Sequence, residues 1–78
     1  MKEDNFNTVL KMFKGRCALN PKHPAEVIHH IIPRSVFFGN PDIIDNLAPL
    51  CRECHDKIHR EGTKRYREIL RQAHENIK

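Results

Sequence analysis

The chain has 78 residues, 38% of them hydrophobic and 31% charged, with no tryptophan and a mean hydropathy of −0.68. These values exclude a membrane-spanning or disordered chain and indicate one small polar-surfaced domain, which buries too little apolar area to be comfortably stable without a disulfide or metal staple. The net charge of +4 and the pI near 9.2 favour a polyanionic partner, and residues 60–78 carry much of the surplus, with six basic and three acidic side chains.

The numbers of cysteines and histidines favour a bound metal ion over a disulfide as the stabilising cross-link. Three cysteines cannot form a closed disulfide framework without leaving one thiol over, whereas histidine can complete a set of metal ligands. The chain has six histidines, and imidazole is the commonest metal ligand. Residues 1–5 lack the charged and then apolar pattern of a secretory signal, so we expect a protein of the reducing cytoplasm.

The first predicted element is a short amphipathic helix over residues 4–14. Four apolar residues recur there at helical spacing and are expected in the core: Phe6, Val9, Leu10 and Phe13. Gly15 follows as the expected C′ residue. From residue 16 to 26 two prolines exclude a helix interior or a regular ladder, which predicts an irregular loop carrying Cys17 and His23.

Two short strands are predicted next. Residues 27–32 form a β-rich run that a proline ends, so the adjacent His29 and His30 are expected on a strand. Turn residues follow at 39–42, and the apolar residues between 43 and 50 can supply the second strand. Together these segments predict a two-stranded unit.

Two helices are predicted at the C-terminal end. Residues 51–60 are expected to be helical, with Gly62 ending the helix. Thr63 is a candidate N-cap for a last helix, which carries the apolar stripe Tyr66, Ile69, Leu70, Ala73 and Ile77. We interpret this stripe and His74 as structural. The predicted fold is one small α+β domain over residues 1–78 with the order α-β-β-α-α.

A catalytic metal site is predicted from the spacing of the histidines. His55 and His59 are four residues apart, so on a helix both rings project from one face and can bind one ion. His29 or His30 can provide a third ligand, and three protein ligands that leave a position open are typical of catalytic sites. Adjacent strand residues point to opposite faces, so one of these two can be the ligand while the other, with an ordinary pKa of ~6.5, acts as a general base.

The cysteines predict a second, separate metal site. His55 directly follows Cys54, so its side chain turns roughly 100° away on a helix and the two are not expected to share an ion. Cys51-x2-Cys54 is half of a structural zinc knuckle, and Cys17 with His23 can be the other half. A redox function for Cys51 and Cys54 is a weaker alternative, because the βαβ context of thioredoxin-like motifs is absent.

Three segments together resemble the HNH endonuclease family, which is also called ββα-metal or His-Me finger. They are Val27-Ile28-His29-His30-Ile31-Ile32-Pro33-Arg34-Ser35, then Asp45-Asn46-Leu47, then Leu50-Cys51-Arg52-Glu53-Cys54-His55-x3-His59. The resemblance covers residues 17–59. These residues are similar to small phage-type members of the family and to the nuclease domains of DNase colicins. In those colicin domains the asparagine also stands nine positions before the first helix histidine, as Asn46 does before His55 here. The helix over 63–77 is a C-terminal extension.

The resemblance implies a role for each matched residue. His29, His55 and His59 match metal ligands, and His30 matches the general base. Asn46 matches a residue that in some members orients the loop bearing the base and in others approaches the metal. The metal implied is divalent, and Mg²⁺, Mn²⁺, Ni²⁺ and Zn²⁺ all remain open. The products implied carry 5′-phosphate and 3′-hydroxyl ends.

The chain departs from the zinc-bearing members of the family at one position. Those members usually have two Cys-x2-Cys pairs, but Cys17 is followed at the matching position by Asn20. His23 is our substitute for the fourth ligand of the structural zinc. Cys17, His23, Cys51 and Cys54 are therefore the expected set.

The predicted function is a metal-dependent DNA endonuclease or nickase. Phosphate contacts are expected from six basic residues: Arg34, Arg52, Lys64, Arg65, Arg67 and Arg71. The alternative is a zinc-stapled nucleic-acid-binding module without catalysis, whose signature would be a missing base or ligand. The sequence does not choose between a nuclease that acts alone and one that acts in a larger phage or mobile-element complex in the host cytoplasm, and it does not indicate the oligomeric state.

Overall fold

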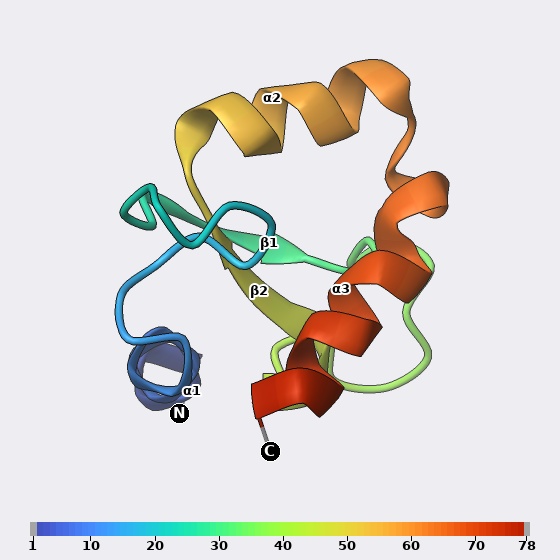
Figure 1. The fold of residues 1–78 in the computed structure, drawn as a ribbon. Helices are drawn as coiled ribbons and strands as arrows, with labels where there is room; N and C mark the ends of the chain where they lie inside the picture. Colours follow the sequence, from blue (N-terminus) through green and yellow to red (C-terminus); the bar gives the residue numbers. More distant parts are fainter. Residues whose placement is uncertain (1, 78) are drawn as a thin grey trace.

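The computed structural model describes residues 2–77 and has the predicted α+β architecture (Figure 1). Its elements are α1 (Lys2–Met12), β1 (Val27–His30), the 3₁₀ turn η1 (Ile44–Asn46), β2 (Leu47–Leu50), α2 (Arg52–Glu61) and α3 (Thr63–Ile77). The predicted order α-β-β-α-α is confirmed, and the 3₁₀ turn is added to it. Across residues 2–77, no helix combines the length and the apolar character needed to cross a bilayer.

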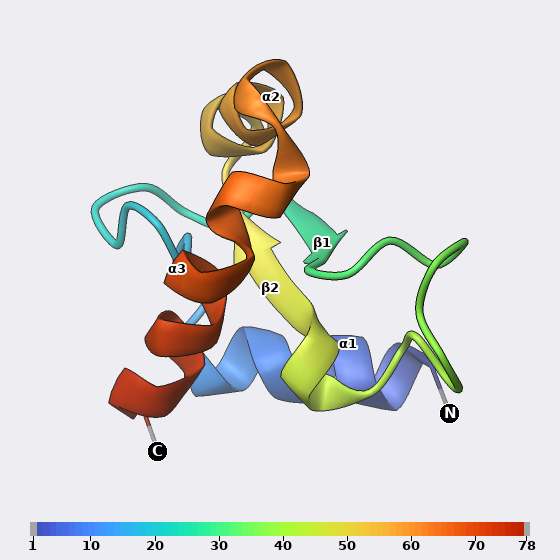
Figure 2. The ribbon, with the colours of Figure 1, turned by 90° about the vertical axis from the view of Figure 1, so that its right-hand side faces the viewer.

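The two strands form an antiparallel hairpin at the centre of the molecule. Val27 pairs with Leu50 at one end of the register, and His30 pairs with Leu47 at the other. In both views α2 lies on one side of this hairpin and α1 on the opposite side, while α3 runs between them (Figures 1 and 2). Because neighbouring strand residues alternate between faces, His29 points toward α2 and His30 toward the side of α1.

The core connects the hairpin to α2, α3 and the loop after α1. Its buried members are Cys17, Ile31, Ala48, Leu50, Cys51, Ile58 and Leu70. Ile58 from α2 and Leu70 from α3 are the apolar anchors of the two C-terminal helices, and each fully buried side chain of this size stabilises the fold by about 1.5–3 kcal/mol. Two of the three cysteines lie in this core, so the predicted staple would sit at the point where the loop, the hairpin and α2 meet.

The first strand ends two residues earlier than predicted. The backbone N–H of Ile31 donates to the carbonyl of Asn46 at 2.8 Å, and that of Ile32 donates to the Asn46 side-chain Oδ1, also at 2.8 Å. These bonds satisfy the two backbone amides without β-ladder pairing, because the segment that precedes β2 turns through η1 at this point. Residues 43 and 44 therefore do not belong to the second strand.

The ends of α1 and α2 differ from the prediction by one or two residues. α1 ends at Met12, and Lys14, with φ 56°, takes the left-handed C′ position that we expected for Gly15. The N–H of Lys14 donates to the Lys11 carbonyl and that of Gly15 to the Leu10 carbonyl, which is the Schellman pattern with glycine at C″. Gly62 ends α2 as predicted, at φ 105°.

The last helix buries only part of the predicted apolar stripe. α3 begins at Thr63 itself, and Leu70 and His74 are its buried residues, whereas Ile69 is 50% and Ile77 is 39% exposed. His74 Nε2 donates to the Leu47 carbonyl at 2.6 Å. This bond attaches α3 to β2, so the structural interpretation of His74 agrees with its position.

Candidate metal centre and active site

Three histidines from two elements converge beside the hairpin. His29 comes from β1, and His55 and His59 come from successive turns of α2, with potential ligand atoms of all three within 4.8 Å of one another. The Nε2 atoms of His55 and His59 are 3.2 Å apart. Nitrogens that bind one tetrahedral ion at 2.0–2.1 Å lie about 3.3 Å from each other, so this spacing fits a shared metal.

The chemistry of the cluster also fits a metal ion. His29 is only 5% exposed, and its buried Nε2 has no hydrogen-bond partner within residues 2–77. Burial, together with the neighbouring His55, His59 and His30, lowers the pKa of His29 to about 4. Burial and His59 likewise lower the pKa of His55, although Asp56 opposes this effect. Imidazoles that stay neutral at pH 7 present a lone pair, which is the form that binds a metal.

The histidine cluster opens onto a solvent-accessible cavity of about 380 Å³. The residues that line it are Ile28, His29, His30, Pro33, Arg34, Ser35, His55, His59 and Thr63. His30 shares this cavity but is outside the group of three converging ligands. The structure therefore separates the two adjacent histidines as strand alternation predicts, and gives both access to one space.

His30 has a carboxylate partner that the sequence analysis missed. Its Nε2 lies 2.7 Å from Oδ1 of Asp42, which is 2% exposed, and its ring packs edge-on against Phe6 of α1. The sequence predicts only a turn at Asp42. The one available signal was a charged residue following Asn40 and Pro41, but the path of the loop that returns it to His30, twelve residues earlier, is not encoded in any local spacing.

Asn46 is buried and holds the loop between the strands. Its Nδ2 donates to the carbonyls of Pro41 at 2.8 Å and Ile32 at 3.1 Å, and its Oδ1 accepts from the Ile32 N–H. The amide is thus fully used in backbone bonds at both ends of the loop. Of the two roles that the resemblance leaves open for Asn46, this geometry matches the loop-orienting one.

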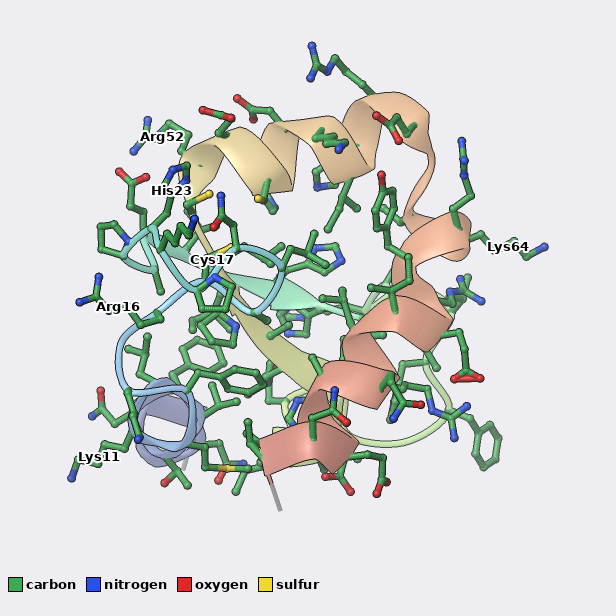
Figure 3. The ribbon with its side chains drawn as sticks, viewed as in Figure 1. Lys11, Arg16, Cys17, His23, Arg52 and Lys64 are labelled. Atoms are coloured by element: carbon green, nitrogen blue, oxygen red, sulfur yellow. The ribbon has the colours of Figure 1, made fainter. Side chains whose placement is uncertain are left out.

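A second group of potential ligands lies at the start of α2. Cys17, Cys51 and Cys54 are free thiols with sulfur atoms within 4.8 Å of one another. Backbone N–H groups of Asn20 and Cys54 donate to Cys17 Sγ and Cys51 Sγ, each at 3.4 Å. The fourth expected ligand, His23, places Nδ1 3.6 Å from Cys51 Sγ, and Figure 3 shows it beside the first turn of α2.

The thiols have strongly different proton affinities. Burial opposes ionisation of Cys17, but backbone N–H groups of Cys51 and Asn20 outweigh it and lower the pKa of this thiol. Burial, with Cys51 and Cys17 as neighbours, raises the pKa of Cys54 to about 12. Ionised Cys17 thus disfavours ionisation of Cys54, and a bound cation would offset the charge of both thiolates.

The six predicted phosphate-binding residues lie at different places along α2, α3 and the loop after β1. Arg34 lines the histidine cavity, and Lys64 and Arg65 are exposed directly after Thr63, which lines the same cavity. Arg52 is at the other end of α2, beside the cysteine cluster (Figure 3). Two more residues lie further along α3: Arg67 has a buried Nε with no partner within residues 2–77, and Arg71 lines a small pocket with His74.

A comparison with protein-family models matches residues 15–61 to HNH endonuclease. This match covers more than half of the chain, including both ligand clusters, and the protein therefore belongs to the HNH endonuclease family. Members are nucleases that act on nucleic acid and generally use divalent metals. Neither the comparison with curated proteins nor that with solved structures returned a match. α1 and α3 lie outside the matched residues.

Proposed function

We propose that this chain is a metal-dependent DNA endonuclease that hydrolyses phosphodiester bonds and nicks duplex DNA. One observation carries the proposal: three histidines converge on a common point, while a fourth, held away from them by a carboxylate, faces the same open cavity. A purely structural metal site would use four protein ligands and would need no separate histidine beside it.

His29, His55 and His59 are the proposed ligands of the catalytic ion. A divalent ion bound there would supply positive charge to offset the charge that develops on the phosphate and on the departing 3′ oxygen. The protein's own contribution is to bring these three imidazoles together and to keep His29 in its neutral, metal-binding form. Burial of His29 against the two helix histidines does both.

His30 is the proposed general base. It removes a proton from a water molecule whose oxygen then forms the new bond to phosphorus, while the bond from phosphorus to the 3′ oxygen breaks. The electron pair of that bond stays on the 3′ oxygen, which takes a proton from solvent. The products are a 5′-phosphate and a 3′-hydroxyl end. A positioned general base contributes typically 10²–10⁴-fold to the rate.

Basic side chains near the cavity are the proposed phosphate contacts. Arg34 lines the cavity, and Lys64 and Arg65 begin α3 next to it. Contacts of this kind hold the DNA backbone without reading its sequence, so we expect weak sequence preference. Arg52, Arg67 and Arg71 do not line this cavity, and we assign them a secondary part in binding.

A structural zinc bound by Cys17, Cys51, Cys54 and His23 completes the proposal. Its support is the convergence of three free thiols with an imidazole beside them, at the point where the N-terminal loop meets α2. A zinc there would fasten this loop to a core that is otherwise small. Chelation is therefore expected to unfold the protein as well as to inactivate it.

Incubation of the zinc-loaded protein with supercoiled plasmid tests the function. We expect conversion to open circles when Mg²⁺, Mn²⁺, Ni²⁺ or Zn²⁺ is added, and none with excess EDTA. If none of the four metals supports nicking by folded protein at micromolar concentration, the chain is a zinc-stapled nucleic-acid-binding module and the proposal is wrong. Retention of plasmid in a gel-shift assay without cleavage would identify that alternative.

A further inference from the structure

Asp42 is a buried carboxylate for which the proposed function gives no role. It lies in the long loop between β1 and η1, is 2% exposed, and points its Oδ1 at His30 Nε2 over 2.7 Å. A carboxylate removed from water is costly unless hydrogen bonds compensate it. Contacts from the surrounding fold must therefore stabilise the buried carboxylate of Asp42.

The backbone around Asp42 is fixed from three directions. The Asp42 N–H donates to Asn40 Oδ1 at 3.0 Å, and the Asp42 carbonyl accepts from Asn5 Nδ2 of α1 at 2.9 Å. The preceding carbonyl, that of Pro41, accepts from Asn46 Nδ2 at 2.8 Å. Asn40 and Asn46 are close to this segment in the chain, whereas Asn5 is 37 residues from Asp42, so both local and tertiary contacts hold the carboxylate in place.

The His30 ring is correspondingly constrained. Phe6 of α1 packs against it edge-on, with 6.5 Å between the ring centroids, on the side of the hairpin away from α2. Because a carboxylate only accepts hydrogen bonds, the Nε2 that faces Asp42 must carry the proton. The lone pair of the neutral ring is then on Nδ1.

We propose that Asp42 is the positioning residue for the general base: it fixes His30 in the Nε2–H tautomer, so that Nδ1 is the atom that takes the proton of the attacking water. The kinetic part of this inference rests on the proposed function. Asp42 also stabilises the imidazolium formed after proton transfer, before His30 returns its proton to solvent. α1, which lies outside the residues matched by the family model, takes part through Asn5 and Phe6.

The test combines ¹⁵N NMR of the histidine rings with nicking kinetics on zinc-loaded full-length protein. Wild type, Asp42→Asn and Asp42→Ala are compared at alkaline pH, where imidazoles are neutral, and His30 is assigned by the signals lost in His30→Gln. Asp45→Asn is the matched control, because it removes the same charge from an exposed position three residues away.

We expect wild-type His30 to be in the Nε2–H form, and Asp42→Ala to shift it toward a mixture of tautomers. In Asp42→Ala kcat falls about 10–100-fold with KM within about twofold, whereas Asp45→Asn changes neither. Asp42→Asn can present either its oxygen or its amide to the ring, so kcat follows whichever tautomer its spectrum shows. If Asp42 had a merely structural role, the His30 tautomer and kcat would not change together.

Two results would overturn the inference. The first is a wild-type spectrum in which His30 is in the Nδ1–H form. This measurement does not depend on nuclease activity and can be made even if the variants fail to fold. The second is a folded Asp42 variant that changes tautomer but keeps wild-type kcat. Failure of the wild-type protein to cut DNA would refute the proposed function instead, and the wild-type spectrum would still decide whether Asp42 fixes the ring.

Discussion

The Nε2 atoms of His55 and His59 lie 3.2 Å apart on one face of α2, and the buried ring of His29 meets both of them edge-on. Strand and helix thus present three imidazole rings to one point, next to a cavity that His30 shares. The proposed division between the histidines that bind the ion and the one that moves a proton leads to specific expectations.

Replacement of His55 or His59 by alanine should remove the catalytic ion and leave the fold intact, because neither ring is part of the apolar core. We expect metal content to fall by one ion per chain and nicking to fall by at least about 10²-fold. Elemental analysis and plasmid nicking measure the two effects. Lys57→Ala, exposed on the same helix, is the control and should match wild type. A His55→Ala protein with full metal content would contradict the assignment of this ligand.

Zinc affinity at the two clusters should respond differently to pH. The raised pKa of Cys54, about 12, means that this thiol must lose a proton when zinc binds, so affinity at the cysteine cluster rises as pH rises. Each proton displaced corresponds to about a tenfold change in affinity per pH unit. The lowered pKa of His29, about 4, leaves that ring deprotonated from pH 6 to 8, so it contributes no such dependence.

Isothermal titration with zinc at pH 6, 7 and 8 checks this difference. Buffers of different ionisation enthalpy give the number of protons released, and His55→Ala isolates the cysteine cluster. We expect at least one proton per zinc at the cysteine cluster and a shallower pH dependence at the histidine cluster. A steeper pH dependence of zinc affinity at the histidine cluster than at the cysteine cluster would show that the pKa directions argued from burial are wrong.

Asn46→Ala should destabilise the protein and slow cleavage without changing its metal content. The substitution leaves the Ile32 N–H and two carbonyls without their partner, which we expect to cost about 2–4 kcal/mol. The loss of activity follows from release of the loop that carries Asp42. Urea unfolding gives the stability change, and Asn76→Ala, at an exposed position of α3, serves as control. If Asn46→Ala instead loses one metal ion per chain with unchanged stability, Asn46 acts as a ligand.

Arg34→Ala should weaken DNA binding more than catalysis. We expect KM to rise several-fold, and the salt dependence of binding to become shallower by about one phosphate contact. Arg16→Ala removes the same charge from an exposed loop position outside the cavity and should have little effect. Fluorescence anisotropy with a labelled duplex at several salt concentrations compares the two. An equal effect of both substitutions would mean that Arg34 acts only through net charge.

The features predicted correctly from the sequence depend on local geometry. The helical spacing of His55 and His59 and the alternation of His29 and His30 on a strand hold wherever those elements form. The positions of the helices and strands followed from hydrophobic periodicity and from residues that end an element, such as Gly62. This is why both ligand clusters could be anticipated, including the proximity of His23 to Cys51.

The features that were missed depend on tertiary structure. The contact between Asp42 and His30 depends on the path of a loop that Asn5 and Asn46 fix from outside it. The exposure of Ile69 depends on how α3 packs against the hairpin, which periodicity does not determine. For the same reason the sequence does not show that Arg52 and Lys64 lie far apart, near opposite ends of α2 (Figure 3).

The central claim is that His30 transfers a proton and does not hold the ion. Its most direct test is the metal content of His30→Ala, measured by elemental analysis together with plasmid nicking by the same sample. We predict two metal ions per chain, as in wild type, with nicking reduced about 10²–10⁴-fold. A His30→Ala protein that retains wild-type nicking, or that has lost one of its two metal ions, would contradict the account.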